Sequence, residues 1–358
     1  MEKTNTLNTK TYHEQKSIDN TLKLRAILKT LPPVAKDYFR AVEPTTSART
    51  RISYAYDIRV FFHFLMQNNP VYKDYTIDQF TLQDLERLEP VDIEEYQEYL
   101  KVYENDESRQ ITNTERGLAR KMSALRSFYG YFFKRQAISR NPVLLVDMPK
   151  LHEKAIVRLD TDEVAKLLDY VEHGGDDLTG QRKAYYEKTK NRDLAILTLL
   201  LGTGIRVSEC VGLDIQDVDF RNNGIKVTRK GGNEMIVYFG DEVANALKSY
   251  IYTTRKTALP LPGHENALFL STQKKRMGVQ AVENMVKKYA REVTPNKKIT
   301  PHKLRSTYGT ALYRETGDIY LVADVLGHKD VNTTKKHYAA IDENRRRKAA
   351  GAVKLREV

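Results

Sequence analysis

The chain has 358 residues, a formal net charge of +12 and one cysteine. This length allows two domains, the single cysteine excludes an intrachain disulfide, and the positive charge favours a polyanionic partner such as nucleic acid. The polar first twenty residues and the lack of a run of about 18 apolar residues argue against a signal peptide and a membrane span. We therefore expect a cytoplasmic protein with no membrane partner, and the spacing of the histidines predicts no metal site.

Three segments of the first half carry apolar residues at helical spacing. Residues 45–66 begin with a run of Ser and Thr that can cap a helix, and residues 90–103 and 113–135 repeat the pattern. Amphipathic helices of this kind bury their apolar faces against each other. We expect a polar N-terminal segment over residues 1–30, followed by an all-helical domain over residues 31–147.

The helical pattern stops near Asn141 and Pro142, and a polar stretch follows Met148. We place a linker at residues 148–156 and a second domain at residues 157–358. In that domain a helix begins at Thr161, a buried helix covers residues 193–201, and apolar and polar residues alternate over 224–239 around a turn, which predicts a hairpin. The whole chain is thus expected to be mostly α with a small antiparallel β-sheet, and to end in a tail over residues 339–358.

Two stretches of the second domain offer a cation to a phosphate. Arg206 lies in T-G-I-R-V-S-E, and its planar guanidinium can hold two phosphate oxygens. A surface salt bridge between Arg206 and Glu209 is an equally good interpretation. Lys230 lies in R-K-G-G at the expected hairpin turn, where neighbouring cations can lower its pKa and make it a proton donor. An ordinary solvated turn is the alternative.

Two further stretches add histidines, an arginine and a tyrosine. If Pro301 begins a helix, His302 and Arg305 lie three residues apart near its N-terminus, where both can approach one anion. In L-G-H-K-D-V-N-T-T-K-K-H-Y, His328 and Tyr338 flank a pair of threonines, and the polar neighbours of Tyr338 argue against a place in the core. An amphipathic helix start and a capping histidine are the alternatives. The set as a whole is what a metal-free phosphoryl-transfer site needs.

These four stretches, in this order, resemble the signature motifs of the tyrosine recombinase (phage integrase) family. The first half adds T-R-I-S-Y-A-Y-D-I-R-V-F-F-H-F-L and R-K-M-S-A-L-R-S-F-Y-G-Y-F-F, which are similar to helices of that family's core-binding domain. The resemblance covers the chain from about residue 45 and is greatest to the Xer subfamily. It implies two domains, a helical core-binding domain of the SAM-like type and a mixed α/β catalytic domain.

The resemblance also implies a role for each polar residue of the four stretches. Two arginines and a histidine would grip the scissile phosphate, a second histidine would hydrogen-bond it, a lysine would protonate the departing 5′ oxygen, and a tyrosine would be the nucleophile. A phenol has a pKa of about 10 and needs a base or a positive field to attack. The resemblance implies that Arg206, Arg305 and His302 grip the phosphate and that His328 hydrogen-bonds it. Lys230 would be the proton donor and Tyr338 the nucleophile. His302 is also the candidate base, and Glu209 would orient the site.

Two positions depart from the family's usual pattern. Ser306 follows Arg305 where many members have His, and His337 adds one residue between His328 and Tyr338 compared with the commonest spacing. Neither departure removes a catalytic group. The second one lengthens the segment that has to bring Tyr338 to the phosphate.

The function implied is site-specific recombination of double-stranded DNA through a 3′-phosphotyrosyl intermediate and a Holliday junction, with no metal or other cofactor. Four protomers would act on two sites, and the Xer subfamily suggests chromosome dimer resolution with a host DNA translocase or another accessory protein. The alternatives are an integrase of a phage or mobile element, a tyrosine-type topoisomerase that relaxes DNA without a preferred site, and an inactive DNA-binding protein.

Some polar residues outside the motifs are candidates for contact with DNA. Basic groups would mostly hold phosphates, whereas amides can read base edges. The candidates are Arg49, Arg51, Tyr54, Arg120 and Lys121 in the first domain and Arg276, Gln280 and Asn284 in the second.

Overall fold

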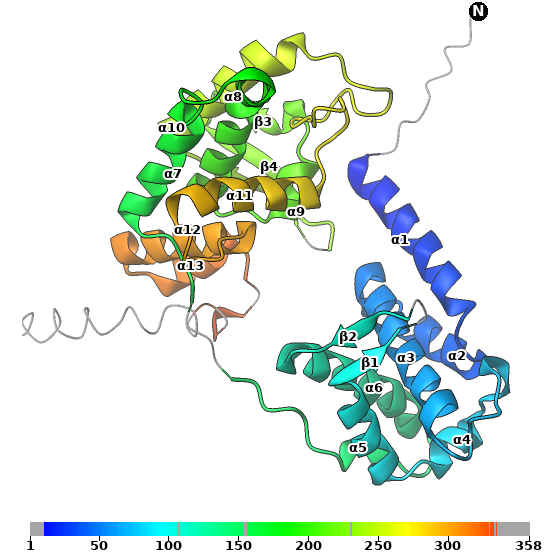
Figure 1. Ribbon diagram of the computed structural model, residues 1–358. Helices are drawn as coiled ribbons and strands as arrows, with labels where there is room; N and C mark the ends of the chain where they lie inside the picture. The colour runs from blue at the N-terminus through cyan, green and yellow to red at the C-terminus, as the bar shows by residue number, and fades with distance from the viewer. Residues whose placement is uncertain are drawn as a thin grey trace, which may run out of the picture. The chain divides into compact units, whose positions relative to one another are not determined.

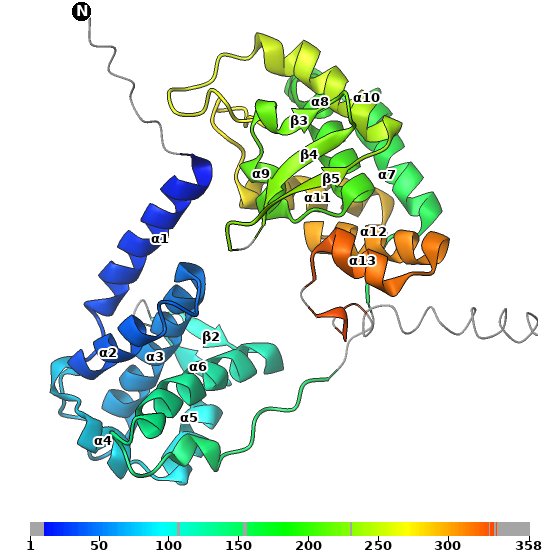
Figure 2. The same cartoon turned by 180° about the vertical axis from the view of Figure 1, so that it is seen from behind.

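The structure is a computed structural model that describes residues 11–105, 108–152, 156–229, 231–328, 330–332 and 334 (Figures 1 and 2). Contacts divide the chain into two units, Met1–Lys154 and Ala155–Val358. The division falls inside the stretch 148–156 that the sequence suggests as a linker. None of the described helices is both long and apolar enough to cross a membrane.

The N-terminal unit is built from helices, several of which begin at a polar cap. Ser47 precedes α3, and its hydroxyl accepts a hydrogen bond from the backbone N–H of Thr50 at 3.1 Å, which satisfies a donor that the first turn leaves unpaired. The helices are α1 (Tyr12–Leu28), α2 (Pro33–Ala41), α3 (Ala48–Asn68), α4 (Leu82–Arg87), α5 (Pro90–Tyr99) and α6 (Glu115–Lys134).

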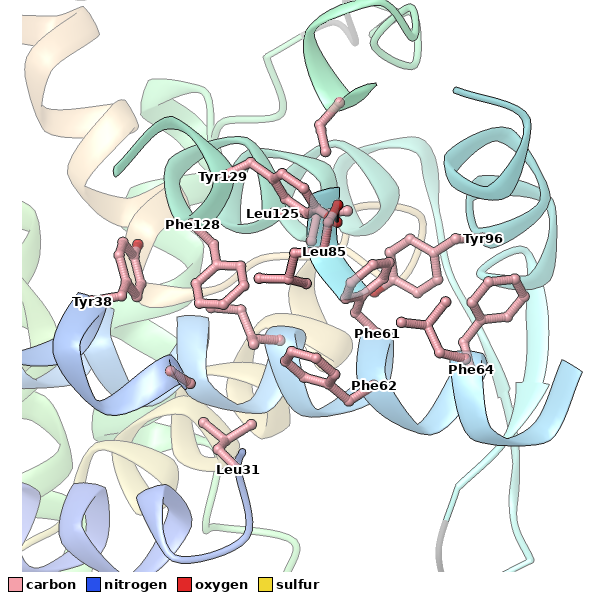
Figure 3. Close-up of a cluster of buried hydrophobic side chains, with 14 of the residues drawn as sticks. Leu31, Tyr38, Phe61, Phe62, Phe64, Leu85, Tyr96, Leu125, Phe128 and Tyr129 are labelled. Atoms are coloured by element: carbon pink, nitrogen blue, oxygen red, sulfur yellow. Dashed lines mark hydrogen bonds between the residues drawn. The ribbon is translucent and has the colours of Figure 1, made fainter. Parts of the chain in front are cut away.

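Aromatic rings fill the core of this unit, between α2, α3, α5 and α6 (Figure 3). Tyr38 and Phe128 meet edge to face with ring centroids 5.3 Å apart, and Phe61 and Tyr96 do so at 5.0 Å. Such pairs prefer this geometry because the positive edge of one ring faces the negative face of the other. The helical periodicity expected for α3, α5 and α6 is confirmed by this packing.

Two features of the N-terminal unit differ from the expectation. Residues 12–28 form α1, which packs against α3 with Leu24 and Ile27 buried, whereas the sequence predicted only a polar segment. The unit is also not all-helical, because β1 (Val102–Glu104) and β2 (Gln110–Thr112) pair as an antiparallel ribbon after α5. Each strand has only three residues, too few to show an alternating pattern in sequence.

The C-terminal unit contains a three-stranded antiparallel sheet in the order β3-β4-β5. In β4 and β5, Ile225 faces Val237 across the expected hairpin, which is confirmed. The strands are β3 (Val218–Asp219), β4 (Gly224–Thr228) and β5 (Glu234–Tyr238). The helices are α7 (Thr161–His173), α8 (Gly180–Thr203), α9 (Val207–Gly212), α10 (Asp241–Ser249), α11 (Val279–Val293), α12 (Pro301–Thr316) and α13 (Ile319–Leu326).

Helix α8 is the central element of this unit. Its second half is fully buried at Leu197, Leu199 and Leu200, and the helix packs against α7, α10 and α12. Helices α12 and α13 lie side by side at one end of the unit in both views (Figures 1 and 2). The C-terminus of α8, the first turns of α12 and the end of α13 together support the candidate site.

Candidate active site

Arg206 lies in the short turn between α8 and α9. Helix α8 ends at Thr203 and is capped by Gly204, which has a φ of 63° and leaves no room for a Cβ because the ring of Tyr308 packs there. Two residues later Arg206 caps α9, where the carboxylate of Glu209 accepts its backbone N–H and its Nη1, each at 2.8 Å. Glu209 is buried and the Arg206 side chain is 35% exposed. The salt bridge between Arg206 and Glu209 that the sequence suggested as an alternative is therefore present. The carboxylate of Glu209 is buried, however, and it holds the guanidinium of Arg206 in place.

Helix α12 begins at Pro301, as predicted, and carries the next two candidates. Arg305 is buried, and it donates from Nη1 to the carbonyl of Gly204 at 2.6 Å and from Nη2 to the carbonyl of Leu326. His302 lies three residues earlier, in the first turn, and is exposed. The helix therefore presents an anchored guanidinium and an accessible imidazole near its N-terminus.

His328 follows the end of α13. Gly327 ends this helix with a φ of 62°, and the backbone N–H of His328 donates to the carbonyl of Ala323 at 2.9 Å. The imidazole Nδ1 lies 2.8 Å from the hydroxyl of Thr334, which is fully buried. When Thr334 donates this bond, the imidazole keeps its proton on Nε2 and can donate it to an oxygen.

The end of α13 is the point where these residues meet. Arg305 donates to the carbonyl of Leu326, Arg206 donates to the carbonyl of Gly327 at 3.3 Å, and His328 is the next residue. The structure thus brings together Arg206, Glu209, Arg305 and His328, with His302 on the same helix as Arg305. Lys230 and Tyr338 lie outside the described residues.

The arrangement is suited to an anion with several oxygens. Two guanidinium groups and an imidazole on separate elements offer donors that can stabilise charge as it develops on a phosphate. Among the described residues, no three histidine, cysteine or carboxylate side chains group as a metal site would require.

Two residues of this region were not singled out by the sequence analysis. Thr334 orients His328, and Arg229 donates from Nη2 to the carbonyl of Val325 at 2.7 Å. The Thr-Thr pair in the last motif was the available signal for Thr334. The only sequence signal for Arg229 was its position directly before Lys230.

The candidate DNA contacts on α3 have different environments. Arg49 is exposed in the first turn. Arg51 is largely covered and pairs with Glu43 at 2.7 Å, and Tyr54 packs partly buried against the aromatic core. Arg49 alone among the three is exposed.

Lys121, expected at the surface, is instead buried in α6. Its Nζ lies 3.6 Å from Oδ1 of Asp57, which is itself buried and also pairs with the half-exposed Arg120. A buried carboxylate requires such partners because desolvation disfavours its charge. Burial raises the pKa of Asp57 and lowers that of Lys121, while each group opposes the shift of the other. Lys121 therefore has a structural partner inside the unit.

Replacing Asp57 with Ala is expected to lower the free energy of unfolding by about 3 kcal/mol, because the change leaves Lys121 buried without a carboxylate. Calorimetric unfolding of the full chain measures the effect. The matched control is Asp37→Ala, which removes an exposed partner of Arg40 and should change stability by no more than about 0.5 kcal/mol. Equal changes in the free energy of unfolding for the two variants would show that the buried pair stabilises the unit no more than an exposed pair does.

The candidates in the C-terminal unit also differ from each other. The guanidinium of Arg276 donates to the carbonyls of Val211 and Leu213 at 3.1 and 2.8 Å and pairs with Asp214. These contacts of Arg276 hold the segment before α11 against the end of α9. Gln280 and Asn284 are exposed on α11, one turn apart, and share a hydrogen bond of 3.0 Å.

Residues 157–345 match the phage integrase family. A tyrosine recombinase XerC of Caldanaerobacter subterraneus subsp. tengcongensis is 32% identical over 327 residues, which cover 89% of this chain and 86% of that protein. A tyrosine recombinase XerD of Staphylococcus epidermidis is 34% identical over 222 residues, 62% of this chain and 71% of that protein.

Solved structures show a similar fold. The Tn1549 transposon integrase in complex with transposon right end DNA superposes with a TM-score of 0.62 at 19% identity, over 89% of this chain and 99% of that one. The XerH recombinase bound to its palindromic difH substrate gives 0.61 at 17% identity, over 85% and 78%. At these identities the likeness concerns the fold, and it extends over both units.

Proposed function

The chain belongs to the phage integrase family of tyrosine recombinases, and from this premise we propose how its residues divide the work of cutting DNA. It is an Xer-type site-specific recombinase, an enzyme that breaks DNA strands and rejoins them in a new arrangement. The observation that supports the proposal most is the meeting of Arg206, Arg305 and His328 at the end of α13.

In the proposed first step the phenolic oxygen of Tyr338 attacks the scissile phosphorus. A bond forms between this oxygen and phosphorus, and the bond from phosphorus to the 5′ oxygen of the next nucleotide breaks. His302 takes the phenol proton, and Lys230 gives a proton to the departing 5′ oxygen. The product is a 3′-phosphotyrosyl ester and a DNA strand with a 5′-hydroxyl.

Arg206, Arg305 and His328 stabilise the charge that builds on the phosphate oxygens in this step. A guanidinium carries five N–H donors, and Arg206 uses its two η nitrogens for Glu209 and Gly327. These anchors fix the plane of the group before DNA arrives, so little reorganisation is needed at the moment of reaction. Buried Glu209 serves as the support of Arg206 and does not contact the phosphate.

The phosphotyrosyl ester retains the energy of the original phosphodiester. A 5′-hydroxyl from a second duplex can therefore attack it, release Tyr338 and join a new strand, without nucleotide hydrolysis. Exchange between two duplexes involves four strand cuts, and each protomer has one nucleophile, so we propose a homotetramer that acts on two double-stranded sites through a Holliday junction. The role proposed in the cell is resolution of chromosome dimers in the cytoplasm, with a host DNA translocase or another accessory protein.

The contacts proposed with DNA follow from exposure. We propose that the exposed Arg49 and the half-exposed Arg120, which also pairs with Asp57, hold phosphates. The exposed amides of Gln280 and Asn284 would meet base edges. Arg51, Tyr54, Lys121 and Arg276 would each have to leave a partner or the core to do the same. For these four the structural role described above is the better account.

A covalent adduct tests this chemistry. The substrate is a DNA duplex whose sequence is recovered from DNA crosslinked to the protein in cells. It carries a nick, so that the short fragment with the new 5′-hydroxyl is lost after cleavage. This substrate is called the nicked duplex below. We expect the adduct to form undiminished in excess EDTA and without nucleotide, because the side chains supply the positive charge that a metal would otherwise bring.

Gel electrophoresis under denaturing conditions measures the adduct. Loss of the adduct in EDTA and its return with magnesium would overturn the metal-free mechanism. An intact plasmid without the recovered sequence should keep its supercoils, whereas relaxation of that plasmid would indicate a topoisomerase.

A further inference from the structure

Arg229 is the last residue before Lys230, at the end of β4, and its side chain reaches α13. Its Nη2 donates to the carbonyl of Val325 at 2.7 Å. The next two carbonyls of the chain accept from Arg305 and Arg206. Three arginines from three different elements therefore bind three consecutive carbonyls, those of Val325, Leu326 and Gly327.

The end of a helix explains this arrangement. The last carbonyls of α13 have no partner within the helix and carry the negative end of its dipole, so guanidinium groups are favourable there. Burial lowers the pKa of Arg229 and nearby Arg206 adds to this shift, whereas Glu209 and Asp324 oppose it. An arginine remains charged under such a shift.

Gly327 is fitted to the guanidinium of Arg229. With a φ of 62°, this residue turns its backbone so that a Cβ would coincide with Nη1 of Arg229. Arg229 thus covers the peptide that leads directly into His328. Its Nε is buried and has no hydrogen-bond partner among the residues that the structure describes, so packing and the bond to Val325 hold the group in place.

We propose that Arg229 is a positioning residue, which holds the turn at Gly327 so that His328 points at the scissile phosphate. It acts through Val325 and Gly327 and does not contact DNA. The inference rests on the proposed function, because it takes His328 as a group that binds the phosphate. Nothing in the family motifs led to this residue, since its role depends on a glycine 98 positions further along the chain.

A double-mutant cycle between Arg229 and His328 tests the inference, with the rate of adduct formation on the nicked duplex as the readout. We expect His328→Ala to slow cleavage by about 10²-fold and Arg229→Ala to slow it by a similar factor through misplacement of the imidazole. Because both changes remove the same interaction, the double variant should be no slower than His328→Ala alone. Affinity for DNA should stay within about twofold for all three variants, since phosphate contacts elsewhere dominate binding.

Gly327→Ala provides a second cycle. The added methyl displaces the guanidinium, so the variant should lose as much rate as Arg229→Ala, and combining the two should cost little more. The conservative Arg229→Lys keeps the charge and one donor for Val325 and should recover part of the rate. The matched control is Arg221→Ala, an exposed arginine in the turn before β4, which should cleave at the full rate.

Losses that multiply in the Arg229 and His328 cycle would overturn the inference, because the two residues would then act independently. A full rate for His328→Ala would instead overturn the proposed role of His328. Calorimetric midpoints are measured for every variant. If Arg229→Ala unfolds, Arg229→Met takes its place in the cycle, because methionine keeps the apolar part of the side chain. The same two outcomes, multiplied losses or a full rate for His328→Ala, are then decisive.

Discussion

Replacing Tyr338 with Phe is expected to abolish the covalent adduct on the nicked duplex, with cleavage reduced by about 10⁴-fold or more. Phenylalanine keeps the ring but lacks the oxygen that forms the bond to phosphorus in the proposed step. Binding should be unchanged, because the phosphate contacts that dominate affinity do not involve this hydroxyl. The measurements are adduct formation and gel shift on the same duplex.

The matched control is Tyr320→Phe, which removes the hydroxyl of an exposed tyrosine on α13 and should form adduct at the full rate. An undiminished adduct with Tyr338→Phe would show that another residue is the nucleophile. Neighbouring His337 would then be the first residue to test, because a histidine can also form a covalent bond to phosphorus.

The second large effect is expected for Arg305. Its guanidinium is buried and donates to the carbonyls of Gly204 and Leu326, so it supports the turn after α8. In the proposed mechanism it also offers positive charge to the phosphate. Arg305→Ala should slow cleavage by about 10³-fold, the upper range for the loss of one donor that stabilises developing charge. Single-turnover rates at saturating protein separate this loss from weaker binding.

Two variants distinguish charge from architecture at this position. Arg305→Lys keeps the charge but cannot reach both carbonyls, so it should remain well below the wild-type rate. Arg314→Ala removes an exposed arginine from the same helix and should cleave normally. A rate for Arg305→Lys equal to that of the wild type would mean that the two carbonyl contacts are dispensable.

Local signals in the sequence were sufficient for many elements of the fold. The helix that begins at Pro301, the helix at Thr161 and the hairpin at residues 224–239 were predicted because proline, capping residues and alternation act over a few positions. Helix α1 was missed because only Leu24 and Ile27 are buried in its 17 residues, which leaves almost no apolar periodicity. The β1–β2 ribbon was missed because its strands are so short.

The site was predictable to the extent that each group stands in a recognisable motif. The pairing of Lys121 with Asp57 and of Arg276 with the end of α9 depends on residues brought together only by folding. The same holds for Arg229 and Gly327. Exposure to solvent therefore could not be judged from residue type. Five of the eight candidate contacts bind or pack against partners in their own unit, namely Arg51, Tyr54, Arg120, Lys121 and Arg276.

In the proposed mechanism Tyr338 carries the broken strand. Digesting the adduct with protease and nuclease and sequencing the modified peptide by mass spectrometry tests it most directly. We expect a nucleotide linked through its 3′ phosphate to the oxygen of Tyr338. A nucleotide on any other residue, or one linked through its 5′ phosphate, would contradict it.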